Sequence, residues 1–179
     1  AAVINDSDEQ RLTEIFRLFG ELKNARRLAA AIVKTRRDRP VTTVEQLLEV
    51  VRPMVDPRQE KKELAQIFQA LRIVVNDEIS ALRDFLTQAI KVLRPGGRLV
   101  VITYHSLEDR LVKNFMKTGN LEGDVEKDFF GRNLSPLKLI TSKPIVPSPG
   151  EVERNPRSRS AKMRVAEKLE PKNTDRVNG

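Results

Sequence analysis

The sequence of 179 residues contains no cysteine, no tryptophan and a single histidine. The absence of cysteine excludes disulfide scaffolds, thiol catalysis and every cysteine-ligated zinc or iron–sulfur site. One histidine cannot build a centre with several histidine ligands, so we expect no metal site. No apolar run approaches the ~20 residues of a membrane-spanning helix. The N-terminus also lacks the charged-then-apolar pattern of a signal peptide. These absences predict a cytoplasmic protein without a membrane partner.

Charge is unevenly spread along the chain. The sequence has 33 Lys and Arg against 25 Asp and Glu, which gives a formal net charge of +8. Residues 1–80 hold 14 basic and 13 acidic residues, whereas residues 81–179 hold 19 and 12. With 39% hydrophobic residues the chain can bury a core. The excess of cations in the second half therefore favours an anionic partner such as a nucleic acid, bound by a folded protein.

The first 75 residues carry helix signals only. Apolar residues recur at helical spacing, and Thr43 with Gln46 has the spacing of a capping box. Ser7 with Gln10 has the same spacing, and Asp56 followed by Pro57 is typical of a helix start. We therefore predict an all-α domain over residues 1–75.

From residue 76 onwards the pattern is mixed. A helix over about 77–93 ends at Arg94-Pro95-Gly96-Gly97, and the β-branched run 98–104 is typical of a strand covered on both faces. A further helix, a strand near 137–141 and an alternating strand at 161–165 follow. These elements predict an α/β domain over 76–170 and a flexible tail over 171–179. Too few elements follow strand 98–104 to cover both of its faces, which suggests that part of the sheet is missing from this chain.

Polar side chains cluster immediately after the strand 98–104. His105, Ser106, Glu108, Asp109 and Arg110 lie within six positions, where open α/β sheets place their ligands. A structural interpretation also fits, with Ser106 capping the next helix and the two carboxylates favoured by its N-terminal dipole. From the residues alone both interpretations stay open.

A second polar cluster lies near the C-terminus. Its five cations fall within eleven positions: Arg154, Arg157, Arg159, Lys162 and Arg164. Cations on an extended segment can follow phosphates, although a basic strand edge also prevents aggregation. Aromatic residues that could stack on a base are few. Tyr104 is the best candidate, although it fits a core position equally well, and Phe129 or Phe130 could assist.

Three segments resemble signatures of one family. The segments are FQALRIVVNDE at 68–78, GGRLVVITYHSLEDR at 96–110 and NPRSRSAKMRVAE at 155–167. In this order they resemble the bacterial 16S ribosomal RNA cytosine-N4 methyltransferases, which are class I S-adenosylmethionine-dependent enzymes. The resemblance extends over about residues 1–169.

The resemblance implies a fold, an activity and a set of site residues. It implies an incomplete Rossmann-like sheet, with only its last strands present, and an inserted all-α domain at 1–75 that recognises RNA. It implies S-adenosylmethionine as methyl donor and 16S rRNA in the small ribosomal subunit as partner. His105, Glu108 and Asp109 would be catalytic, without a choice between the two carboxylates. The substrate would be bound by Tyr104, Ser106, Arg110, Arg154, Arg157, Arg159, Lys162 and Arg164.

The sequence departs from the family at the cofactor site. Its eight glycines include no GxGxG pattern that could cradle a dinucleotide or a similar ligand. We therefore expect a C-terminal portion that lacks the cofactor-binding half and is inactive alone. The alternatives are a non-enzymatic basic RNA-binding module, or a helical domain that contacts protein. Neither the oligomeric state nor the target nucleotide follows from the sequence.

Overall fold

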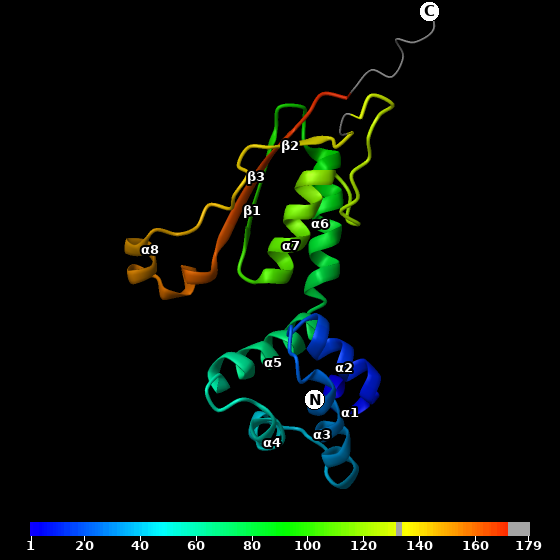
Figure 1. The fold of residues 1–179 in the computed structure, drawn as a ribbon, viewed down its shortest axis with the longest axis vertical. Helices are drawn as coiled ribbons and strands as arrows, with labels where there is room; N and C mark the ends of the chain where they lie inside the picture. Colours follow the sequence, from blue (N-terminus) through cyan, green and yellow to red (C-terminus); the bar gives the residue numbers. More distant parts are fainter. Residues whose placement is uncertain (132–133, 172–179) are drawn as a thin grey trace, which may run out of the picture. The chain divides into compact units, whose positions relative to one another are not determined.

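The computed structural model describes residues 1–131 and 134–171, and the described chain divides after Glu78 into two compact units. Figure 1 shows the elements of both units. Apart from Pro171, the tail that we predicted to be flexible lies outside the described residues. Among the helices described, none combines the length and apolar character needed to cross a membrane.

The first unit contains only helices. They are α1 (Ala2–Asp6), α2 (Glu9–Leu18), α3 (Ala25–Asp38), α4 (Val44–Val51), the 3-10 turn η1 (Arg52–Met54) and α5 (Glu60–Val75). Their apolar stripes meet in one core, in which Leu12, Phe16, Leu28, Ile32 and Ile67 are fully buried. The helical periodicity of the sequence is thus explained by packing around a shared interior.

Local signals in this unit are partly as predicted. Thr43 and Gln46 form the expected reciprocal capping box at the start of α4. The predicted Ser7 cap is wrong, because Asp8 caps α2 by accepting a 2.6 Å hydrogen bond from the Arg11 amide. Asp56 does not start a helix either. Its side chain accepts from the Arg58 amide in a turn, and α5 begins at Glu60.

The second unit alternates helices and strands. Its elements are α6 (Glu78–Val92), β1 (Arg98–Thr103), α7 (Ser106–Thr118), β2 (Leu137–Leu139), α8 (Pro149–Arg154), η2 (Pro156–Ser160) and β3 (Lys162–Lys168). The chain breaks between α5 and α6 at Asn76 and Asp77, and Asp77 has a positive φ of 49°. The mixed α/β class expected for this part of the chain is confirmed.

The three strands form one antiparallel sheet in the order β1-β3-β2. Helices α6 and α7 lie on one side of it (Figure 1), and their apolar faces meet Leu99, Val101 and Ala166 in a second core. The turn before β1 is fixed to β3, since the Gly96 amide donates to the Lys168 carbonyl and the Lys168 amide donates to the Gly97 carbonyl. The central position of β3 therefore ties the end of the chain to the strand that precedes the site.

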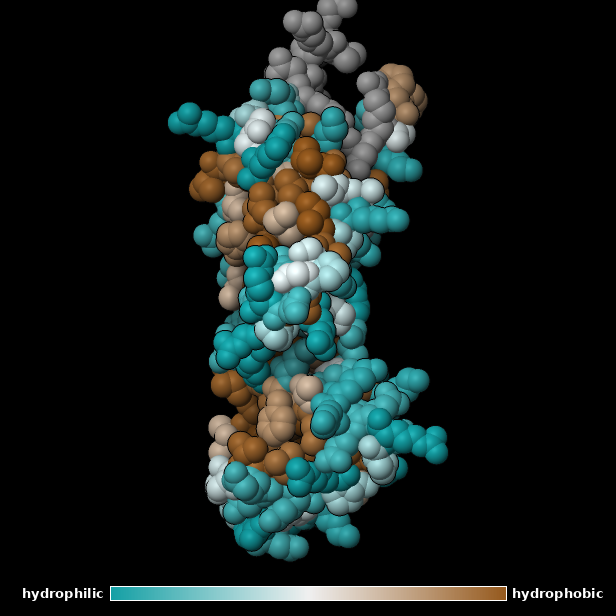
Figure 2. All heavy atoms as spheres, turned by 90° about the vertical axis from the view of Figure 1, so that its left-hand side faces the viewer, coloured by the Kyte–Doolittle hydropathy of each residue, from teal (hydrophilic) through white to brown (hydrophobic). Residues whose placement is uncertain are grey.

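Within the described residues only one face of the strand predicted at 98–104 is covered, in line with the expectation that too few elements follow it to cover both. Side chains along β1 alternate between exposed and buried. Val100 and Ile102 are about half exposed, opposite Val165 and Met163 of β3. Figure 2 shows hydrophobic residues gathered on this side of the sheet. The apolar run of β1 thus supplies one buried face and one open apolar face.

Candidate active site

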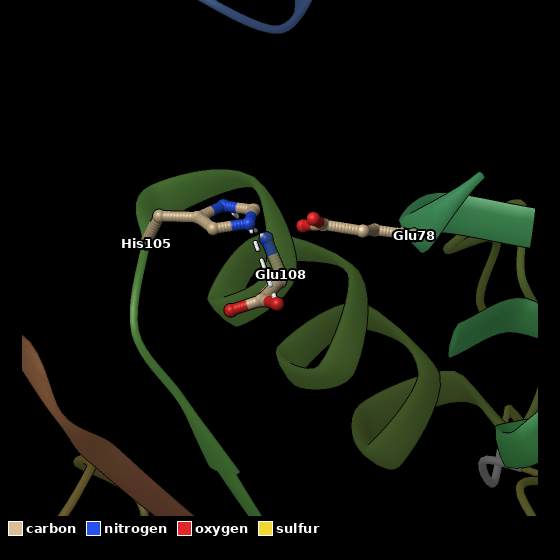
Figure 3. A group of neighbouring side chains, drawn as sticks. All are labelled: Glu78, His105 and Glu108. Carbon is tan, nitrogen blue, oxygen red and sulfur yellow. Dashed lines mark hydrogen bonds and ion pairs between the residues drawn. The ribbon is translucent and has the colours of Figure 1, made fainter. Parts of the chain in front are cut away.

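The residues predicted to form the site lie at the turn between β1 and α7. Helix α7 begins at Ser106, and its N-cap is His105 rather than the predicted Ser106. His105 Nδ1 accepts a hydrogen bond of 3.3 Å from the Glu108 amide. Figure 3 shows the imidazole beside the first turn of α7. Glu78, which is also drawn there, is the first residue of α6 and pairs with Arg72 at 2.8 Å.

Glu108 binds back to the turn that precedes its own helix. Its Oε2 accepts from the Tyr104 amide at 2.9 Å, and its Oε1 lies 3.3 Å from His105 Nε2. The His105 side chain is only 7% exposed, and within the described part of the chain its Nε2 makes no hydrogen bond of acceptable angle. Burial alone would raise the pKa of Glu108. The interactions with His105 and with the Tyr104 amide outweigh burial and lower that pKa.

Asp109 points towards the central strand instead. Arg164 of β3 donates to Asp109 from Nε at 2.6 Å and from Nη2 at 3.1 Å, and Lys162 Nζ donates at 3.4 Å. Asp109 and Arg164 are both buried. Burial by itself would raise the pKa of Asp109, but the hydrogen bonds and charge of Arg164, with Lys162, lower it. The site thus contains two carboxylates that bind different partners.

This arrangement separates residues that the sequence had grouped. Lys162 and Arg164 share a face of β3, but that face covers α7 and holds Asp109. Sequence reasoning missed this pairing. A signal was present, because the same face carries Ala166, whose small apolar side chain is typical of a face packed against a helix.

The remaining candidate residues lie on the surface. Tyr104, which fitted both the core and a stacking position in the sequence, is 57% exposed. The side chains of Ser106 and Arg110 are also exposed, at the first turn of α7. The Tyr104 ring and the start of α7 are therefore open to a ligand.

The other predicted RNA contacts lie on α8 and η2, which precede β3. Arg154, Arg157 and Arg159 are exposed, and Arg154 Nε donates to the Gly150 carbonyl of its own helix. Ser158, between the other two, is buried and donates to the Asn155 carbonyl at 2.8 Å. The short 3-10 turn therefore directs Arg157 and Arg159 to solvent.

Phe129 and Phe130 form an exposed aromatic pair at a loop tip. Their rings meet edge to face at 5.7 Å, and Phe129 is 99% exposed. The turn is set by Asp128, which accepts from the amides of Phe130 and Gly131. Four acidic residues lie in this loop, at positions 122, 124, 126 and 128, against two basic residues, at positions 127 and 132. The local charge therefore disfavours the RNA contact predicted for these rings.

The glycines on either side of β1 and α7 do not form a cradle for S-adenosylmethionine. The paired glycines before β1 use their backbone groups to bind β3, so they do not form a free loop of N–H donors. Gly119 ends α7 in a left-handed conformation and packs against Pro136. These two glycine sites therefore offer no backbone cradle for the cofactor.

Comparison with known proteins places these features in a family. The sequence matches the MraW methylase family over residues 1–169. It is 58% identical over 168 residues to a ribosomal RNA small subunit methyltransferase H of Bacteroides thetaiotaomicron, and 60% identical over 168 residues to that of Phocaeicola vulgatus. A third relative of the same name, from Parabacteroides distasonis, is 57% identical over 169 residues.

Each of these alignments covers 94% of this chain but 55% of the relative. The chain therefore spans about half the length of the curated relatives it matches. The resemblance predicted from the three segments is confirmed by these matches, and the chain belongs to the MraW methylase family.

Proposed function

We propose that this chain forms the substrate-side portion of an enzyme that transfers a methyl group from S-adenosylmethionine to the N4 amine of a cytosine in 16S rRNA. Family membership and the names of the relatives support a methyltransferase of the small-subunit rRNA. The observation that carries the proposal is the position of the Glu108 carboxylate, which is held beside His105 and the Tyr104 amide at the carboxyl end of β1.

The chemistry of the target explains why such a group is needed. An exocyclic amine presents two N–H donors, and an ionised carboxylate is purely an acceptor. A Glu108 carboxylate that keeps its charge can accept these hydrogen bonds and orient the amine, and can receive a proton as the amine becomes substituted. Glu108 suits this role better than Asp109, because Asp109 is ion-paired with the buried Arg164 and with Lys162, whereas the Glu108 side chain is 24% exposed.

The proposal gives Tyr104 a role in holding the base. Its exposed ring lies directly before His105 in the chain, and its amide is bound to Glu108. An aromatic ring next to a hydrogen-bond acceptor is the arrangement by which extruded bases are stacked and read. Ser106 and Arg110 would contact the same nucleotide from the first turn of α7.

The proposal also assigns cofactor binding to sequence outside this chain, which we therefore expect to be inactive alone. We interpret the three strands as the last part of a Rossmann-like sheet whose other strands continue from the open edge of β1. The open apolar face around Val100 and Ile102 would then be covered in the complete sheet. The helical unit would be the inserted domain that recognises RNA.

Calorimetry and a methylation assay test the function. We expect the chain alone to bind no S-adenosylmethionine. A chimera can be made by adding the segment of the Phocaeicola vulgatus relative that this chain does not match. This chimera should bind S-adenosylmethionine and methylate small ribosomal subunits. Replacing Glu108→Gln in the chimera should lower turnover at saturating cofactor, whereas Glu126→Gln in the acidic loop should not. Equal turnover in both variants would contradict the role of Glu108.

The exposed arginines support a second candidate, a basic module that binds RNA without catalysis. Arg157 and Arg159 are directed to solvent by the 3-10 turn of η2. The chimera separates the two candidates. Binding to rRNA without binding of S-adenosylmethionine would favour the module over the enzyme.

A further inference from the structure

The cap of α7 defines which nitrogen of His105 carries a proton. Nδ1 accepts from the Glu108 amide, so Nδ1 must be unprotonated. In a neutral imidazole the proton then lies on Nε2, which is 3.3 Å from the Glu108 carboxylate. The tautomer follows here from the partner of each nitrogen.

His105 is an unusual cap, and its geometry depends on the first turn of α7. Ser, Thr, Asp and Asn are the usual N-caps because their short side chains reach the amides of the first turn. The longer imidazole must be held at a defined distance from the Glu108 amide to make the same bond. A small rotation of the first turn would break this bond and release Nδ1.

The residue that follows Glu108 anchors this turn. Asp109 is one position further along α7, and its amide donates to the His105 carbonyl at 3.1 Å. Its carboxylate receives two hydrogen bonds from Arg164 in the central strand and one from Lys162. The pair is buried, with Asp109 9% and Arg164 6% exposed. Planar bidentate pairs of this kind fix orientation as well as distance.

We propose that Asp109 and Arg164 are positioning residues, which hold the first turn of α7 on β3 and thereby lock His105 in the Nε2–H tautomer facing Glu108. This assigns Asp109 a role through its neighbours rather than contact with substrate. It also removes Arg164 from the RNA-binding set. The catalytic role of the fixed His105 tautomer rests on the proposed function. The restraint of the tautomer by Asp109 and Arg164 does not.

Because His105 is the sole histidine, its imidazole gives an unambiguous NMR signal in the uniformly 15N-labelled chain. Long-range 1H–15N correlation distinguishes the two neutral tautomers by the widely separated shifts of protonated and unprotonated nitrogens. In mildly alkaline buffer the wild-type chain should show the Nε2–H pattern. Asp109→Asn should move the two nitrogen shifts towards each other, as expected for exchanging tautomers.

Two further variants complete the test. Arg164→Lys keeps the charge but loses the bidentate geometry, so it should give a smaller shift in the same direction. Asp124→Asn, at an exposed loop carboxylate, should leave the pattern unchanged. Backbone amide dispersion in the same samples reports folding. If the Asp109→Asn chain fails to fold, the tautomer pattern of the Arg164→Lys chain tests the proposal instead.

Two results would overturn the proposal: an Nδ1–H pattern in the wild-type chain, or a wild-type pattern in a folded Asp109→Asn or Arg164→Lys chain. Neither result depends on methyl transfer. A chimera without methyltransferase activity would refute the proposed function and leave this measurement untouched.

Discussion

Arg164 holds both carboxylate oxygens of Asp109, a residue 55 positions earlier in the sequence. The pair joins the first turn of α7 to the central strand of the sheet, with both side chains buried. Ion pairs in such surroundings are strongly coupled to the rest of the fold, because loss of one partner leaves a buried charge without compensation. Two residues that the sequence had assigned to catalysis and to RNA binding thus have a shared structural role.

This pair predicts a specific dependence of stability on pH. The pKa of Asp109 is lowered in the folded chain, so its contribution to stability is complete above the unfolded pKa of about 3.9 and is lost as pH falls through the folded pKa. Asp109→Asn should therefore cost about 3–5 kcal/mol near pH 7. The difference from wild type should shrink below about pH 4. Urea unfolding at several pH values measures both. A constant difference down to pH 3 would contradict the assignment.

The site illustrates what sequence patterns could and could not define. The position of the cluster was predictable, because a buried strand followed by a polar helix start marks the ligand end of a sheet. The different partners of Glu108 and Asp109 could not be predicted. Adjacent side chains on a helix point about 100° apart, and only the tertiary structure determines which groups each carboxylate contacts. Glu108 turns back to the Tyr104 amide, while Asp109 reaches β3.

The Thr43 capping box should contribute measurably to the helical unit. Thr43 accepts from the Gln46 amide, and the Gln46 side chain accepts from the Thr43 amide. Thr43→Ala should lower the free energy of unfolding by about 0.5–2 kcal/mol. Thr87→Ala, which removes a threonine from the exposed side of α6, is the matched control and should be nearly neutral. Thermal unfolding monitored by circular dichroism compares them. Equal effects would mean that the box contributes nothing beyond helix propensity.

Predictions of the fold succeeded where the signal was local and failed where it needed a neighbour. The Thr43 box depends on a few consecutive residues, and it is present. Whether a face of β1 is exposed depends on which other segments pack on it. The apolar sequence of the strand is the same whether those segments are present or absent. For the same reason the antiparallel partner of β1 was not evident from the run itself.

Substitution of two glycines should distinguish the cost of backbone strain from the cost of overpacking. Gly119 and Gly131 have nearly the same left-handed φ, 82° and 77°. A Cβ at Gly131 meets nothing within 4 Å, whereas one at Gly119 would overlap the ring of Pro136. Gly131→Ala should cost only the conformational term of about 1–2 kcal/mol. Gly119→Ala should cost about 1–3 kcal/mol more, from overpacking. Urea unfolding of the two variants tests this order, and the reverse order would contradict the packing of α7 on Pro136.

The arginines of η2 should account for part of the salt dependence of RNA binding. Each phosphate contact that is removed should make the slope of log K against log salt less steep by about one. Arg157→Gln with Arg159→Gln should therefore reduce the slope by about two.

Arg164→Gln offers no such test, because its guanidinium is buried against Asp109. Arg83→Gln on α6 is the control for loss of a cation in the same unit. Fluorescence anisotropy with a 16S rRNA fragment at several salt concentrations gives the slopes. If the double variant and the control have the same slope as wild type, RNA does not contact η2, and the cations of the helical unit become the site to examine.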